Sequence, residues 1–366
     1  MKKEGNILTE SSWAILAIVR MILASIVCIG HLEYFTILPK GFTGILLLGG
    51  KAAVLGFLLI SGFSIGNSYV KSARGYFKRR FLRIYPLYFF SVLFAVFLQS
   101  YLGSPYRLPY TTMVSAGGLT SLVNFFFLQG FASITIPYNG PLWSLAVEVF
   151  FYLLVPLLLR FPRWLIYLII VSSMISFNVV QKQFLFGHLA FIYCWAWLIG
   201  FLIGAYRKYG EASLFFVFGI AIVYTNRTIT TEPLSWLTYF AVGIIIFYVS
   251  LSNIAISKAT VKVFNYLGEL SYPLYLFHMP LYLLLYHLGV RQAEIFCLLL
   301  IILTIPLNYV LDRKLRTAFW IPFTEFLADR GRIALQLLKN KKKVESESKD
   351  AFRASSPVAN YRQLTK

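Results

Sequence analysis

The amino-acid sequence predicts an all-α polytopic membrane protein, a bundle of about ten transmembrane helices with both termini in the cytoplasm. Composition is the first reason for this fold class: 58% of the 366 residues are hydrophobic, 13% are charged, and the mean hydropathy is +0.71. That is more apolar surface than one soluble core can bury. The apolar residues also gather in runs long enough to cross a bilayer, and the cationic residues lie mostly between alternate runs.

The first apolar run, residues 13–36, is about as long as one full crossing, and no small-residue cleavage site follows it. We therefore expect a retained helix rather than a removed signal peptide. In chain order, the ten expected helices cover residues 13–36, 45–70, 84–102, 142–159, 164–181, 186–206, 211–225, 233–252, 268–289 and 293–311. The connection over residues 103–141 contains several prolines and an apolar patch, and we expect a re-entrant or interfacial segment there.

The cationic residues orient the helices. With a cytoplasmic N-terminus, 27 of the 34 Lys and Arg residues fall on the cytoplasmic side, five fall outside, and Arg20 and Lys51 lie within spans. This asymmetry predicts two cytoplasmic termini and a multi-pass protein of the cell (inner, cytoplasmic) membrane. It also accounts for the net charge of +20, through insertion and through attraction to anionic membrane lipids. We therefore expect no nucleic-acid partner.

Two regions differ in composition. Residues 1–312 form the predicted transmembrane domain. Residues 313–366 form a predicted basic cytoplasmic tail, which we expect to be largely disordered beyond a surface helix around 323–339. The three cysteines lie far apart in apolar runs without CxxC spacing, so neither a disulfide framework nor a metal site is expected.

Several ionisable side chains lie inside the predicted spans, where each costs several kcal/mol unless it is paired or hydrated. Arg20 and His31 are eleven residues apart, so they share one helix face at a separation of about 16 Å along the axis. Glu148, in the stretch LWSLAVEVFFY, lies about two turns into its span, at a depth similar to that of His31. His278 lies near the middle of the ninth predicted span. We therefore expect His31, Glu148 and His278 to converge.

These residues also have purely structural interpretations. His278 can be a satisfied packing residue, and Trp143 can be an anchor at the membrane interface. Glu148 can neutralise Arg20 or Lys51 as a buried ion pair. The combination of His31 with Glu148 is harder to explain in this way.

The segment GYFKRRFLRIYP offers a second kind of site. Its cationic residues can be only an inside-positive topology signal. Arg80 and Arg83, however, are spaced i, i+3 next to a predicted helix start, and this spacing suits two guanidinium groups that grip a phosphate.

Five motifs, in order along the chain, resemble those of the acyltransferase 3 family, integral membrane acyltransferases that O-acylate surface polysaccharides and other extracytoplasmic acceptors. The motifs are Arg20 and His31 with ten residues between them, FLLISGFSIG with Ser61, RRFLRIYP, PLWSLAVE with Trp143, Ser144 and Glu148, and SYPLYLFH with His278. The resemblance covers about residues 13–311. Two departures stand out: Ala17 replaces a usual acidic residue, and Val149 and Phe150 replace a Glu and a Gln that often follow the motif glutamate.

The resemblance implies a membrane O-acyltransferase, most often an O-acetyltransferase. The donor would be acetyl-CoA or another acyl-CoA that arrives from the cytoplasm as a co-substrate, with no permanently bound cofactor. The acceptor would be a hydroxyl of an envelope polysaccharide or of a lipid-linked glycan on the other side of the membrane.

The resemblance also suggests roles for the residues. We expect His31 to act as the general base toward the acceptor hydroxyl, with Glu148 orienting its ring. Arg20 would position the donor or stabilise developing negative charge, and a covalent acyl-histidine is an alternative. Arg80 and Arg83 would hold the CoA phosphates. The expected substrate-binding residues are Trp143, Ser144, His278 and Ser61.

A different class of function stays open. The chain can be a proton-coupled secondary transporter or a lipid-linked-sugar flippase, because Glu and His side chains at depth also make proton relays. Transporters often show paired repeats with matching broken helices, and the sequence shows none. A membrane scaffold would have no need of a glutamate and histidines at matching depth. We therefore favour the enzyme.

Overall fold

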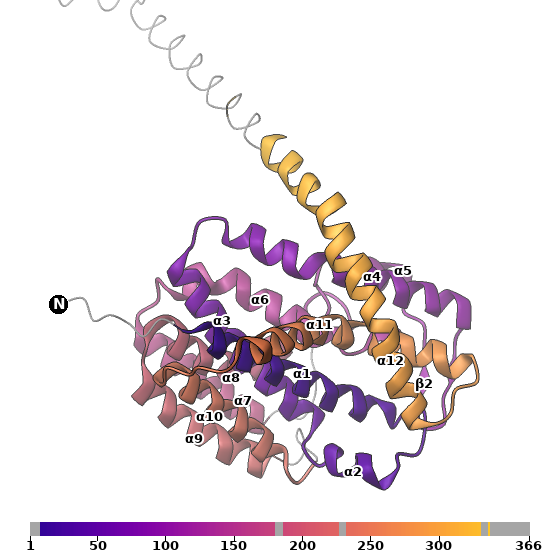
Figure 1. Cartoon of the computed structure of the whole chain (residues 1–366), viewed down its shortest axis with the longest axis horizontal. Coiled ribbons are helices and arrows are strands. Elements are labelled where there is room, and N and C mark those ends of the chain that lie inside the picture. Colours follow the sequence, from indigo (N-terminus) through magenta and orange to yellow (C-terminus); the bar gives the residue numbers. More distant parts are fainter. Residues whose placement is uncertain (1–7, 180–185, 227–231, 331–335, 337–366) are drawn as a thin grey trace, which may run out of the picture. The chain divides into compact units, whose positions relative to one another are not determined.

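Helices account for 78% of the chain that the computed structural model describes, residues 8–179, 186–226, 232–330 and 336. In a membrane, an apolar segment must satisfy its own backbone N–H and C=O groups, and the α-helix does so within one segment. The helices are α1 (Glu10–Leu32), α2 (Lys40–Leu46), α3 (Gly50–Lys71), α4 (Tyr76–Leu102), α5 (Gly118–Asn124), α6 (Leu142–Leu158), α7 (Arg163–Val179), α8 (His188–Tyr206), α9 (Tyr209–Thr225), α10 (Ser235–Leu251), α11 (Lys258–His287) and α12 (Ala293–Leu307) (Figure 1).

A helix occupies each of the ten ranges predicted from the sequence, namely α1, α3, α4 and α6 to α12. Within the described residues, five helices are long and apolar enough to cross a membrane, and they begin at Glu10, Gly50, Tyr76, His188 and Ala293. Four others, α6, α7, α9 and α10, have 17 residues each, which is about 26 Å of helix against a hydrocarbon core of about 30 Å. The chain is an all-α, multi-pass membrane protein, while ten crossings and two cytoplasmic termini stay predictions.

Two helices begin earlier than the hydropathy predicted. α4 begins at Tyr76 rather than near residue 84, and α11 begins at Lys258 rather than near residue 268. Both have polar, cationic first turns, which lower the hydropathy without preventing helix formation. The hydroxyl of Ser257 caps α11 by accepting from the backbone N–H of Thr260. As a consequence, the cationic segment GYFKRRFLRIYP, which we expected to lie next to a helix start, forms the first turns of α4.

The connection between α4 and α6 is a folded segment. It contains the strands β1 (Tyr106–Arg107) and β2 (Thr112–Met113), which pair antiparallel, the helix α5 and the 3-10 turn η1 (Pro137–Asn139). Buried side chains hold it in place: Tyr88 donates to the carbonyl oxygen of Asn124, and Gln129 Nε2 donates to that of Leu142 at 3.0 Å. The first bond holds the connection to α4 and the second holds it to the start of α6. Its predicted interfacial placement stays a prediction.

The chain divides after Arg313 into two units. In the second unit, residues 314–330 are helical and include the π-helical segment η3 (Arg316–Trp320). A π-helical segment η2 (Asn308–Lys314) follows α12. Residues 331–335 and 337–366, which make up most of the predicted disordered tail, lie outside the described residues.

The helices α3 and α8 approach so closely that several of their facing positions require glycine. These positions are Gly62 and Gly66 in α3 and Gly200 and Gly204 in α8. A Cβ atom at Gly62 would collide with the carbonyl oxygen of Trp197. Small residues four positions apart let helix backbones meet in a membrane. The contact places Ser61, the neighbour of Gly62, against α8.

Asn139, in the α4–α6 connection, donates a hydrogen bond to a backbone carbonyl group of α11. This carbonyl group has no partner within α11 because a proline lies four residues later. Pro280 has no N–H, so the carbonyl oxygen of Leu276 lacks its partner within the helix. The Nδ2 atom of Asn139 donates to this oxygen at 2.9 Å, and both residues are fully buried. The bond holds the connection beside the part of α11 that carries His278.

Replacing Asn139 with alanine is expected to lower the free energy of unfolding by about 1–3 kcal/mol, because the buried carbonyl of Leu276 loses its donor. Reversible unfolding of the purified protein in detergent measures this cost. In a Pro280→Ala background the helix supplies the missing N–H, so the cost of Asn139→Ala should shrink toward zero. An equal cost in both backgrounds would contradict the explanation.

Candidate functional site

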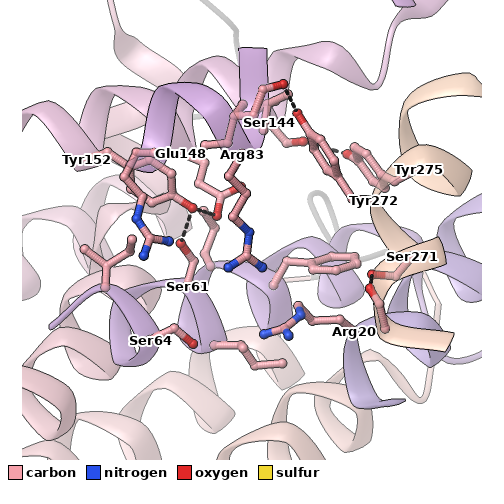
Figure 2. Close-up of a pocket in the computed structure, with 18 of the residues that line it drawn as sticks. Arg20, Ser61, Ser64, Arg83, Ser144, Glu148, Tyr152, Ser271, Tyr272 and Tyr275 are labelled. Carbon is pink, nitrogen blue, oxygen red and sulfur yellow. Dashed lines mark hydrogen bonds between the residues drawn. The ribbon is translucent and has the colours of Figure 1, made fainter. Parts of the chain in front are cut away.

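A cavity of about 340 Å³ lies between five helices, α1, α3, α4, α6 and α11 (Figure 2). This volume lies within the range of small-molecule sites. The polar residues that line it are Arg20, Ser61, Ser64, Ser68, Arg80, Arg83, Ser144, Glu148, Tyr152, Ser271, Tyr272 and Tyr275. The cavity thus brings together residues from all five sequence motifs.

Three arginines and one glutamate line this cavity, which gives it an excess of positive charge within an apolar bundle. Figure 2 shows the guanidinium groups of Arg20 and Arg83 pointing into the same space. Arg80 donates through Nη2 to Ser68 Oγ at 3.0 Å, while its buried Nε–H has no hydrogen-bond partner among the described residues. Like charges repel strongly where little water screens them. The arrangement therefore favours an anionic ligand.

Glu148 lies at the end of a chain of hydrogen bonds that begins on α8. Trp197 Nε1 donates to Ser61 Oγ at 3.3 Å, and Ser61 Oγ donates to Tyr152 Oη at 3.3 Å. Tyr152 in turn donates its hydroxyl hydrogen to the carboxylate of Glu148. Each hydrogen in the chain points toward Glu148, so the chain holds its carboxyl group in place. Ser61, which we expected to bind substrate, lines the cavity and also positions Tyr152.

Ser144 and Tyr275 place a pair of hydroxyl groups in the cavity wall. Ser144 Oγ lies 2.6 Å from Tyr275 Oη. The two oxygens lie 3.1 and 3.2 Å from the carbonyl oxygen of Pro141. Both side chains are buried. One of the two hydroxyl hydrogens lies between the two oxygens and the other points to the carbonyl oxygen of Pro141, so the pair presents acceptor oxygens to the cavity.

His31 and His278 form a separate pair beside the cavity. His31 Nδ1 lies 3.0 Å from the carbonyl oxygen of Val27 and 3.2 Å from His278 Nε2. His278 Nδ1 lies 2.6 Å from the carbonyl oxygen of Tyr275. Neither histidine is among the residues that line the cavity. Tyr275 connects the two places, because its hydroxyl is in the cavity wall and its ring centroid is 5.8 Å from that of His278.

The structure does not contain the predicted pair of Glu148 and His31. The hydrogen bond of Glu148 goes to Tyr152, and the side-chain partner of His31 is His278. Equal depth on two helices does not determine which neighbour each side chain faces. Here the last turn of α1 presents His31 to α11 rather than to α6.

Trp143 also differs from its expected place. It is not among the residues that line the cavity, and its ring centroid lies 5.1 Å from that of Tyr193 in α8. A packing contact between α6 and α8 therefore accounts for this residue. The described residues contain no group of three side chains that could hold a metal ion.

Comparison with known proteins identifies the family. Residues 13–313 match the profile of the acyltransferase domain that defines the acyltransferase 3 family. The chain belongs to the acyltransferase 3 family. Nodulation protein 10 of Rhizobium leguminosarum bv. viciae is 32% identical over 132 residues, which cover 32% of this chain and 36% of that protein. The match therefore spans about a third of the relative's length. No solved structure matches the chain.

The structure explains the first departure from the pattern of the acyltransferase 3 family. Ala17, where an acidic residue is usual, is 5% exposed, and a Cβ atom at Gly268 would collide with it. The helices α1 and α11 thus pack closely at this level. A carboxylate at position 17 would not fit, so Arg20 points into the cavity without an acidic neighbour one turn earlier on α1.

A packing contact also explains the second departure, at Phe150. Phe150, where the family often has a glutamine, lies with its ring centroid 5.0 Å from that of Phe131 in the α4–α6 connection. In this member of the acyltransferase 3 family, an apolar contact therefore replaces polar groups behind Glu148. The contact helps hold the connection against α6.

Several cavity residues were not predicted as site residues. Ser64 and Ser68 follow Ser61 on α3 at helical spacing, and this polar stripe in an apolar helix is a signal that the sequence contains. Tyr152 and Tyr275 lie one turn from predicted residues, at i+4 from Glu148 and i−3 from His278. Trp197, which does not line the cavity but donates to Ser61, has no such signal, because that bond joins residues 136 positions apart.

Proposed function

We propose that the protein is a membrane O-acyltransferase that moves an acyl group, most simply acetyl, from a cytoplasmic acyl-CoA to a hydroxyl of an extracytoplasmic envelope glycan. The observation that carries this proposal is the cavity in which Arg20, Arg80 and Arg83 face a single carboxylate, that of Glu148. A positive charge without a counter-ion is costly in an apolar bundle, so the site favours an anion. A CoA ester brings phosphates on one end and a thioester on the other.

Arg80 and Arg83 are the proposed phosphate ligands. Both lie in the first turns of α4, within the most cationic stretch between two predicted spans. Arg83 is exposed as well as lining the cavity, so it can meet a ligand that arrives from the surface. The unpartnered Nε–H of Arg80 gives that ligand a buried donor. The thioester arm would then extend along the cavity toward Ser144 and Tyr275.

His31 is the proposed base. It lies in the last turn of α1, next to the exposed residues Glu33 and Tyr34, so an acceptor can approach it from that end of the helix. Its Nε2 atom makes no hydrogen bond to any described residue, whereas Nδ1 is occupied. In the proposed reaction Nε2 takes the proton of the acceptor hydroxyl as its oxygen attacks the thioester carbonyl. The tetrahedral intermediate expels the CoA thiolate, which receives that proton.

Arg20 is the proposed partner of the carbonyl oxygen, and a hydroxyl of the Ser144–Tyr275 pair joins it by turning its hydrogen away from the carbonyl oxygen of Pro141. Negative charge develops on this oxygen during attack, and donors that already point to its position stabilise it most. Glu148 keeps the three guanidinium groups near one another by partly neutralising them. This role replaces the predicted one, in which Glu148 orients the ring of His31.

The double variant Arg80→Ala, Arg83→Ala is expected to raise KM for the acyl-CoA donor by about 10- to 100-fold with a smaller effect on kcat, because it removes charge-assisted bonds to phosphate. Initial rates of transfer in liposomes at varied donor concentration measure this. Lys71→Ala is the matched control, since Lys71 is exposed in the same cationic stretch and is not among the cavity residues. An unchanged affinity for the acyl-CoA donor in the double variant would mean that the two arginines act only as an inside-positive signal for membrane topology.

A further inference from the structure

The inference concerns His278 and rests on the proposed function of His31. The side chain of His278 is fully buried on α11. Three rings surround it, with centroid distances of 5.1 Å to His31, 5.8 Å to Tyr275 and 6.0 Å to Tyr282. Although its motif suggested a substrate-binding residue, His278 is not among the residues that line the cavity.

Two backbone carbonyl groups determine where the ring hydrogens lie. A carbonyl oxygen can only accept, so His278 Nδ1, 2.6 Å from the carbonyl oxygen of Tyr275, carries a hydrogen. By the same reasoning, His31 Nδ1 carries a hydrogen, because it lies 3.0 Å from the carbonyl oxygen of Val27. Each neutral imidazole holds one N–H, so both Nε2 atoms are then acceptors.

The contact between the two rings agrees with this assignment. His31 Nδ1 and His278 Nε2 are 3.2 Å apart, and the assignment makes the first a donor and the second an acceptor. Hydrogens on both atoms would point at each other. The hydrogen on His31 Nδ1 is thus shared between two acceptors, one on α1 and one on α11.

We propose that His278 is the positioning residue of this acyltransferase, which holds the ring of His31 so that its Nε2 atom is the free base. In a hydrolytic triad, a carboxylate plays this part by accepting from the Nδ1–H of the catalytic histidine. Here a second, neutral histidine accepts from the same atom. When His31 takes the acceptor's proton on Nε2, its Nδ1–H bond to His278 becomes charge-assisted and stronger. His278 therefore stabilises the protonated base without touching substrate.

Kinetics of three variants test the proposal. His278→Leu removes the acceptor and is expected to lower kcat on the order of 100-fold with little change in KM for donor or acceptor. His278→Gln keeps an amide oxygen that can accept from His31 and is expected to stay within about 10-fold of wild type. His287→Gln is the matched control, because His287 is exposed on the same helix and should leave turnover unchanged.

The outcomes separate this inference from the proposed function. Absence of transfer by folded wild-type protein would overturn the proposed function itself. Transfer that requires His31 but is unaffected in His278→Leu would overturn only the positioning role. Equal losses in the Leu and Gln variants, in proportion to lowered thermal stability, would show a packing role and would also overturn it.

A spectroscopic measurement tests the same point without activity. The chain has four histidines, so ¹⁵N-histidine labelling gives a spectrum simple enough to assign with the His31→Ala and His278→Leu variants. The proposal predicts that both His31 and His278 are neutral Nδ1–H tautomers in the folded protein. An Nε2–H tautomer at either residue would overturn it.

Discussion

Replacing His31 with alanine is expected to lower kcat for acyl transfer by about 10²- to 10⁴-fold, the usual contribution of a positioned general base. The acceptor hydroxyl would then have no group to take its proton at neutral pH. The donor should still bind, because Arg80 and Arg83 are unchanged. Transfer of labelled acetyl groups and binding of acyl-CoA by the same purified protein measure the two effects separately.

Two controls make the result specific to His31. His287→Ala removes a histidine that is exposed at the end of α11 and should turn over normally. The thermal unfolding of His31→Ala in detergent should stay close to that of wild type, since its side chain is only partly buried. Near-normal turnover by a folded His31→Ala protein would rule out His31 as the base.

The second large effect is on folding. Gly62→Ala is expected to lower the free energy of unfolding by about 3 kcal/mol, because the new methyl group would collide with the carbonyl oxygen of Trp197 and push α3 and α8 apart. The backbone cannot move aside as a flexible side chain could. Reversible unfolding in detergent or bicelles measures the cost.

Gly30→Ala is the matched control for this prediction. Gly30 also lies within a helix, α1, but a Cβ atom there would meet nothing within 4 Å. Alanine favours the helix over glycine by about 1 kcal/mol, so this variant should be as stable as wild type or slightly more stable. If both variants unfold alike, close approach of α3 and α8 is not what requires glycine at position 62.

Much of the fold could be predicted from the sequence, because apolar runs in a membrane have few alternatives to helices. All ten predicted ranges contain a helix. The early starts of α4 and α11 were missed because hydropathy measures the apolar segment, whereas a helix can continue through cationic turns. The sequence does not determine the number of membrane crossings in the same way, because helices of 17 residues are close to the shortest length that spans the hydrocarbon core.

The sequence predicted several of the residues that line the candidate site, but it did not predict which side chains contact each other there. Arg20, Arg80, Arg83 and Glu148 do line one cavity. The pairing of Glu148 with His31 was wrong, because depth along a helix leaves its rotation and its neighbours undetermined. The partner of His31 comes from α11, 247 residues later in the chain, and such contacts depend on how the helices pack.

In the proposed reaction the protein transfers an acyl group from CoA to a glycan on the other side of the membrane. The most direct test places labelled acetyl-CoA on one side of proteoliposomes and an envelope-glycan acceptor on the other. The proposal predicts base-labile label on the glycan with wild-type protein and none above background with His31→Ala. Folded wild-type protein that transfers no label from several acyl-CoA donors to several acceptors, but carries a glycan across the membrane, would contradict it and indicate a transporter.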